Sequence, residues 1–276
     1  MMITISILIL IVAIAIPSFN SQLSPILLTR VASIVLFYSG ALAFNAFYIQ
    51  SIGSGIGIYS GLFHVTTISQ QLDIFLLIIA GLILIPRPGL IEYIKVITNS
   101  SSTKTTVKGS SGSNLENISD SSSIVHTEVL SGIGDKYSLI ILFSTLGSSL
   151  LLSSSDLLSM YLSLELQSFG VYILATLFRE SRLATSAGLK YFLLGGLSSC
   201  FILLGSGLVY FYTGLTNLES IYSLISVSNS ESVTLGLTLG LILIFVGFLF
   251  KISAAPLHNW APDVYDDSPK IGRAHV

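Results

Sequence analysis

Charged residues are scarce in this sequence. Asp, Glu, Lys and Arg make up only 9% of its 276 residues, whereas a soluble domain carries about 25%. Hydrophobic residues make up 52% of the chain, and its mean hydropathy is +0.85. This composition excludes an ordinary soluble domain and predicts an all-α polytopic membrane protein.

Cysteine pairs and ligand-binding motifs are absent as well. The single cysteine, Cys200, cannot form an internal disulfide, and we interpret it as a small buried residue. The sequence has no Walker loop, dinucleotide fingerprint or H-x-x-x-H pair, and its glycine-rich stretch at 53–57 has no strand before it. We therefore expect no cofactor and no metal in this chain. The lack of a basic arm also excludes nucleic acid as a partner.

Long apolar runs are what the sequence does contain. They predict about seven transmembrane helices, and a strand alternative fails because the runs do not alternate with period two. The third run is short and could begin earlier, in the region 62–72. The runs cover roughly residues 3–17, 27–49, 72–86, 138–154, 156–178, 187–212 and 234–255.

A polar stretch divides these runs into two groups. Residues 98–123 are rich in Ser, Thr, Asn and Gly, a composition that cannot bury enough apolar surface to order itself. We therefore divide the chain into N-terminal transmembrane helices at 1–86, a polar loop at 87–137 and a second helical group at 138–269.

Basic residues lie only in alternate loops, which predicts the orientation. Positively charged loops favour the negative compartment, so we expect the N-terminus to face outward and loops one, three and five to face inward. Loops two, four and six carry acidic residues instead, namely Asp73, Asp156, Glu219 and Glu231. Loops one, three and five carry Arg30, Arg87, Lys95, Lys104, Lys108, Lys136, Arg179 and Arg182.

Three ionisable residues remain within the predicted spans: Glu165, Lys190 and Lys251. Placing a lysine near the bilayer centre costs about 2.5–3.5 kcal/mol. Lys251 precedes the helix-breaking Pro256, a combination typical of an ion or proton pathway. A snorkelling lysine at a helix end is the alternative interpretation of Lys251.

Glu165 lies near the middle of the fifth span and is the sharper candidate. A helix places it on one polar stripe with Tyr161, Ser168, Tyr172 and Thr176. The stripe favours a protonatable group in a hydrated path. The alternative is a carboxylate that a neighbouring helix satisfies and that serves packing only.

Glu165 and Lys251 together could form a proton switch. Burial alone favours the neutral form of each group, and close pairing restores both charges. A buried pair that opens therefore releases a proton. Glycines 236, 240 and 247 would let another helix approach the Lys251 face, but the sequence leaves open which helix that is.

Lys190 and His258 are weaker candidates for a proton relay. Lys190 begins the sixth span, where snorkelling to the interface competes with a role in proton entry. His258 follows the proline break, where it could relay protons or only form loop hydrogen bonds.

Three segments carry a resemblance to a known family. They are LSLELQSFGVYILATLFRE at 162–180, GLKYFLLGGLSSCFILLGSGLVYFYTG at 188–214 and GFLFKISAAPLHNWAPDVYDDSP at 247–269. In this order and spacing they resemble the antiporter-like membrane subunits of respiratory complex I. The resemblance covers about residues 138–269, and the serine-rich insert favours a mitochondrial, fungal version.

The resemblance implies a role for the two central charges. Members of this family pair a glutamate in the fifth helix with a lysine in a broken seventh helix, and the matching positions are Glu165 and Lys251. It implies proton translocation by this chain, within a proton-translocating NADH:ubiquinone reductase of the mitochondrial inner membrane. NADH, FMN, iron–sulfur clusters and ubiquinone are then expected in other subunits. The implied partners are the other membrane subunits of the complex and the lipid bilayer, with loops one, three and five toward the matrix.

The sequence also departs from the family. Members carry a second inverted repeat, so we expect 138–269 to be an incomplete five-helix repeat (helices four to seven) in a truncated N-terminal fragment. Residues 270–276 do not continue the family pattern, and we expect them to be an artefactual tail.

Two other functions fit the same residues. One is a subunit of a cation/proton antiporter without an oxidoreductase partner. The other is a structural membrane scaffold in which Glu165 and Lys251 serve packing.

Overall fold

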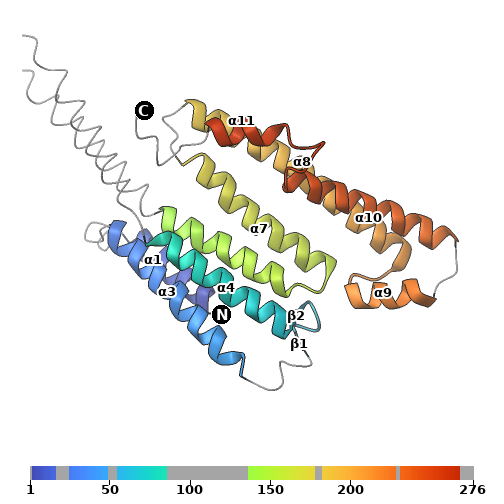
Figure 1. Ribbon diagram of the computed structural model, residues 1–276, viewed down its shortest axis with the longest axis horizontal. Coiled ribbons are helices and arrows are strands. Elements are labelled where there is room, and N and C mark those ends of the chain that lie inside the picture. Colours follow the sequence, from blue (N-terminus) through green and yellow to red (C-terminus); the bar gives the residue numbers. More distant parts are fainter. Residues whose placement is uncertain are drawn as a thin grey trace, which may run out of the picture.

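The structure is a bundle of long helices with one small hairpin (Figure 1). This computed structural model describes residues 2–16, 25–48, 55–85, 136–177, 182–227 and 231–267. The predicted tail at 270–276 and nearly all of the predicted polar loop at 87–137 lie outside these residues. The elements are α1 (Met2–Ala15), α3 (Pro25–Ala46), β1 (Ile56–Ile58), β2 (Phe63–Val65), α4 (Thr67–Leu84), the unlabelled helix Lys136–Ser153, α7 (Leu157–Ala175), α8 (Arg182–Thr213), α9 (Leu218–Val227), α10 (Glu231–Lys251) and α11 (Trp260–Asp267).

The prediction of an all-α polytopic membrane protein is confirmed. Six of the described helices are long and apolar enough to cross a membrane, and α1 is a shorter apolar helix of 14 residues. The outer faces of these helices carry large apolar side chains, such as Phe211 and Leu235, which are 78% and 71% exposed. Such an exterior suits contact with lipid. Cys200 is exposed as well, so the interpretation of this cysteine as a buried residue is wrong.

The third membrane helix begins earlier than the main apolar run, and this corrects the position of Asp73. Thr66 caps α4: its hydroxyl accepts from the Ser69 backbone N–H, and the Ser69 hydroxyl accepts from the Thr66 N–H. This reciprocal capping box sets the start of α4 at Thr67. Asp73 therefore lies inside a membrane helix, and the expectation that it sits in loop two is wrong.

The predicted break in the seventh membrane helix is confirmed. Helix α10 ends at Lys251, and the short helix α11 begins only at Trp260. Ser253 adopts φ of 54°, the left-handed region that does not continue a helix, and Pro256 has no N–H to donate. The break places Lys251 at the last turn of a helix and frees the chain to return along α8 (Figure 1).

Glycines join α8 and α10 closely. A Cβ atom on Gly240 would lie 2.9 Å from the Gly205 carbonyl oxygen, and one on Gly247 would lie 2.9 Å from that of Ser198. The glycines of α10 predicted that another helix approaches it closely, and that helix is α8, the sixth predicted span. Small residues at a helix crossing are the usual way to bring two membrane helices into contact.

The loops two, four and six meet at one end of the bundle. The Leu62 carbonyl oxygen accepts from the Ser155 N–H at 3.1 Å and from the Ser159 hydroxyl at 2.9 Å. Thr216 donates its hydroxyl to the Asp156 carboxylate at 2.6 Å. These contacts join the hairpin, the turn before α7 and the loop before α9, as alternate loops of a membrane bundle require.

Candidate functional site

Glu165 and Lys251 meet in the space between α7 and α10. The Lys251 ammonium lies 3.3 Å from Glu165 Oε1, across 86 positions of sequence. Only 14% of the lysine side chain and 17% of the glutamate side chain are exposed. The Lys251 side chain thus turns into the bundle instead of snorkelling outward, although it stands at the end of its helix.

Two serine hydroxyls complete the surroundings of this pair. Lys251 Nζ donates to Ser168 Oγ at 2.8 Å, a shorter contact than the one to Glu165. Ser199, on α8, donates its hydroxyl to Glu165 Oε1. Three helices therefore hold the pair, and each charged group has a neutral hydrogen-bond partner besides its counter-ion.

This arrangement allows a charge separation at moderate cost. If Lys251 moved away from α7, Ser199 would still stabilise the Glu165 carboxylate, whereas the ammonium would lose both Glu165 and Ser168, which share that helix. A buried pair that loses one member with no such support is destabilised by about 3–5 kcal/mol. The Ser199 contact thus lowers the cost of separating the two charges.

A cavity lined mostly by buried and half-buried side chains adjoins the pair, and we call it the buried cavity. It has a volume of about 340 Å³, and its polar lining includes Lys251, Ser168, Tyr172, Tyr191 and Ser198. Tyr172 comes from the predicted polar stripe, is 6% exposed and packs its hydroxyl against Gly195. A space of this size with several polar groups can hold ordered water.

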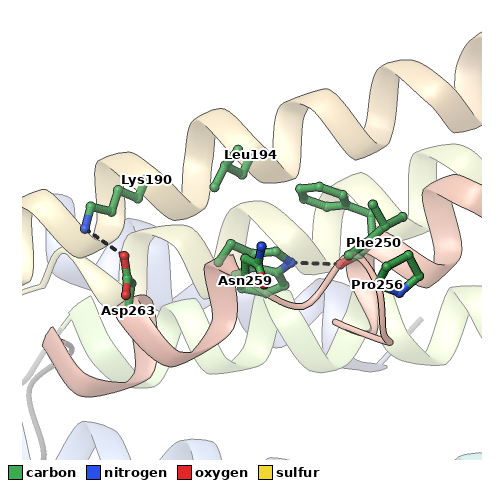
Figure 2. A pocket seen from close by; sticks show the side chains of 8 residues that line it. Lys190, Leu194, Phe250, Pro256, Asn259 and Asp263 are labelled. Atoms are coloured by element: carbon green, nitrogen blue, oxygen red, sulfur yellow. Dashed lines mark hydrogen bonds and ion pairs between the residues drawn. The ribbon is translucent and has the colours of Figure 1, made fainter.

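Lys190 is placed apart from this pair. It lies on α8 with 48% of its side chain exposed, and its ammonium is 3.3 Å from Asp263 Oδ2 on α11. Figure 2 shows this ion pair at one end of a second pocket, with Phe250 and Pro256 at the other end. The structure does not bring Lys190 into contact with Glu165 or Lys251.

His258 is exposed in the break between α10 and α11. Its backbone carbonyl accepts from the Ala261 N–H at 3.0 Å and so supports the first turn of α11. His258 lines neither of the two cavities described above. Its role as a relay group remains a prediction.

Sequence reasoning missed Ser199, Asp263 and Trp260. Ser199 is 34 positions from Glu165, and Asp263 is 73 positions from Lys190. Neither pairing leaves a periodic signal in the chain. A buried carboxylate needs a donor, but the sequence does not specify which of the many serines provides it.

No group of three or more His, Cys, Asp or Glu side chains that could hold a metal ion occurs among the described residues. The absence of a cofactor from this chain stays a prediction.

Comparison with known proteins agrees with this geometry. Residues 154–274 match the family described as NADH:quinone oxidoreductase/Mrp antiporter, transmembrane. The match includes Glu165, Ser199, Lys251 and both halves of the broken helix.

A curated relative, NADH-ubiquinone oxidoreductase chain 2 of Rhizopus oryzae, is 45% identical over 257 residues. The alignment covers 93% of this chain and 45% of the relative, so the chain spans less than half of that protein's length. Its N-terminal helices are therefore part of the similarity, together with the segments that match the family.

Solved structures share the same fold. A chain of respiratory complex I from Thermus thermophilus, with bound aureothin, superposes with a TM-score of 0.61 at 26% identity, covering 98% of this chain and 48% of that one. A chain of the Mrp complex from Dietzia sp. DQ12-45-1b gives a TM-score of 0.60 at 17% identity, covering 96% and 42%, which shows the fold alone. On its sequence and its fold, this chain is similar to NADH-ubiquinone oxidoreductase chain 2 over most of its length, and its residues 154–274 match the NADH:quinone oxidoreductase/Mrp antiporter transmembrane family.

Proposed function

We propose that this chain takes part in proton translocation as a membrane subunit of a mitochondrial NADH:ubiquinone oxidoreductase. The observation that carries the proposal is the buried contact of 3.3 Å between Lys251 and Glu165 at a helix break. Electron transfer from NADH to ubiquinone takes place in other subunits, which hold the NADH, FMN, iron–sulfur and ubiquinone sites. The redox energy reaches this chain as a change in helix packing.

The proton step follows from the two states of the pair. In the closed state Glu165 is a carboxylate and Lys251 an ammonium. When the helices separate, the buried ammonium loses its counter-ion, and its proton leaves for an acceptor on the exit side. Closure then favours uptake of a new proton by the neutral lysine.

The location in the membrane completes the proposal. The chain lies in the inner mitochondrial membrane with its N-terminus outward, and loops one, three and five face the matrix. Neighbouring membrane subunits of the complex and lipid cover its apolar outer faces. Residues 1–86 form a separate N-terminal group, and residues 138–269 carry the antiporter-like repeat.

The test compares Glu165→Gln with Glu165→Asp in the complex that contains this sequence, reconstituted into vesicles. Glutamine keeps the shape but not the charge, so we expect fewer protons moved per NADH oxidised. Aspartate keeps the charge and should retain part of the pumping. An unchanged proton-to-electron ratio with glutamine would refute the role of Glu165.

A cation/proton antiporter without an oxidoreductase partner is the second candidate, because the Mrp complex shares the fold at a TM-score of 0.60. The same vesicles separate the two. Proton movement that follows a sodium gradient, without NADH or quinone, would favour the antiporter.

A further inference from the structure

A second lysine–carboxylate pair lies on the same side of the bundle as the break. Lys190 of α8 and Asp263 of α11 meet at 3.3 Å, and their side chains are 48% and 63% exposed. An ion pair this exposed contributes little to stability, because water screens the two charges. Its place beside a pocket suggests another use.

The pocket beside this pair is open and partly polar. It has a volume of about 320 Å³, and Lys190, Asp263 and Asn259 are its polar lining residues. Figure 2 shows Lys190 reaching from α8 toward Asp263 on α11. Water in this pocket is in reach of a carboxylate and an ammonium at the same time.

Three stacked rings separate this pocket from the buried cavity. Tyr191 stacks on Trp260 with centroids 5.0 Å apart, and Trp260 stacks on Phe250 at 6.2 Å. Phe250 and Trp260 line both cavities, so these two rings stand where the pocket of Lys190 adjoins the cavity of Lys251. We call Tyr191, Trp260 and Phe250 the aromatic wall.

A hydrogen bond fixes the central ring of the aromatic wall. The Trp260 Nε1–H donates to the Phe250 carbonyl oxygen at 3.1 Å. That carbonyl belongs to the last turn of α10, one residue before Lys251. A movement of the α10 end that opens the Lys251–Glu165 pair therefore moves the acceptor that holds Trp260.

The Lys190–Asp263 pair and the Lys251–Glu165 pair are too far apart for a proton to pass directly from one to the other. Lys190 and Ser199 lie nine positions apart on α8, which is about 13 Å along the helix axis. A hydrogen bond spans only about 3 Å, so no direct transfer joins the two pairs. Tyr191 and Tyr172 line the cavity that contains Lys251, and their hydroxyls, with water in that cavity, can carry a proton between the two pairs.

We propose that Lys190 and Asp263 form the site where this unit exchanges protons with the aqueous phase, and that the aromatic wall controls their passage to Lys251. This inference rests on the proposed function. A proton from water is taken up at the Lys190–Asp263 pair and crosses the wall by way of hydroxyls and water. It binds to Lys251 after that lysine has lost its own proton.

The first test measures access to the buried cavity with a small cationic methanethiosulfonate reagent, in the intact complex and with Cys200→Ser to remove the natural thiol. Gln167→Cys reports on the buried cavity and Asn259→Cys on the open pocket. With the wall intact we expect fast labelling at position 259 and slow labelling at 167. Trp260→Ala should make position 167 react roughly tenfold faster, as a barrier lower by about 1.4 kcal/mol would.

Two further variants make this test specific. Trp260→Phe keeps the ring stack and should leave position 167 slow, which guards against a general loss of folding in the alanine variant. Phe211→Ala, on the exposed face of α8, should change nothing. Equal labelling rates at 167 and 259 with the wall intact, or no acceleration by Trp260→Ala, would overturn the role of the wall.

The second test addresses the exchange site. Asp263→Asn should slow proton translocation, Asp263→Glu should restore it, and Asp267→Asn on the same helix should leave it unchanged. Full translocation in Asp263→Asn would overturn the exchange site. The labelling test does not depend on proton pumping. A labelling result that contradicts the role of the aromatic wall therefore leaves the Glu165→Gln result valid. In the same way, a Glu165→Gln result that contradicts the proposed function leaves the labelling result valid.

Discussion

At the scale of single residues, the site depends on what surrounds two buried charges. Lys251 has two partners, Glu165 Oε1 at 3.3 Å and Ser168 Oγ at 2.8 Å. Glu165 Oε1 accepts from both Lys251 and Ser199. The Ser199 hydroxyl comes from α8 and can stay with the Glu165 carboxylate when Lys251 moves away, so we expect it to affect how readily the pair opens.

Ser199→Ala tests this directly. A hydrogen bond to a charged group contributes about 1.5–3 kcal/mol, so loss of the Ser199 hydroxyl should destabilise the Glu165 carboxylate and lower the number of protons moved per electron. Ser199→Thr should restore the ratio. Ser206→Ala is the control, because Ser206 lies exposed on the same helix and bonds only its own turn. Equal ratios in Ser199→Ala and Ser206→Ala would contradict the prediction.

Asp73 gives a prediction about stability. Its Oδ1 is buried inside α4 and has no hydrogen-bond partner among the described residues, while its side chain lies beside Ser149. An unsatisfied buried polar group costs about 1–3 kcal/mol. We expect Asp73→Asn to raise the unfolding temperature of the solubilised complex. Glu219→Gln, an exposed change on α9, should not. A lower unfolding temperature would mean that the Asp73 charge is compensated in the assembled protein.

At the scale of elements, two features position the Glu165–Lys251 pair. One is the break between α10 and α11, and the other is the close contact of α8 with α10. The break brings Trp260 and Asp263 back onto α8, and the glycine contact fixes the height of Lys251 against Ser199. The break ends α10 at Lys251, and the contact with α8 holds that helix end inside the bundle. Both features are needed to bury Lys251 beside Glu165.

Gly240→Ala should loosen this contact. The new Cβ would stand 2.9 Å from the Gly205 backbone oxygen and 2.8 Å from Val209 Cγ2, and overpacking of this kind costs about 1–3 kcal/mol. We expect a lower unfolding temperature and weaker proton translocation. Gly207→Ala is the matched control, because nothing lies within 4 Å of its Cβ position. Equal behaviour of the two variants would show that the α8–α10 contact does not fix the site.

Membrane helices are the elements that the sequence predicts best. Length and hydropathy alone define them, because lipid selects for both. The earlier start of α4, which the sequence left open for the region 62–72, is confirmed because Thr66 and Ser69 cap the helix ahead of the most apolar residues. Glu165 and Lys251 were found because a charge inside an apolar run is rare. Asp263 and Ser199 were missed because polar residues near helix ends, or among many serines, do not stand out.

At the scale of the whole molecule, the helices form a bundle with two distinct ends. The hairpin, the turn before α7 and the loop before α9 are joined by hydrogen bonds at one end. The start of α8 and helix α11 lie together at the other end (Figure 1). The Lys190–Asp263 pair joins α8 and α11 at this second end.

The predicted orientation can be tested with single cysteines in a Cys200→Ser background. Two exposed serines suit this test. Ser186 lies near the start of α8, and Ser223 lies on α9, which follows the other end of α8. An impermeant thiol reagent should label Ser223→Cys from outside intact mitochondria, and Ser186→Cys only from the matrix side. Labelling of both from one side would contradict the predicted span arrangement.

The central claim is that opening the pair removes the Lys251 ammonium from the Glu165 carboxylate, and that Lys251 then releases its proton. Infrared difference spectroscopy of the complex, with and without NADH, measures this through the carboxylate stretching bands of Glu165, which shift when the counter-ion leaves. We predict a difference signal that Glu165→Gln abolishes and Ser206→Ala preserves. An identical difference spectrum in the Glu165→Gln variant would contradict the account.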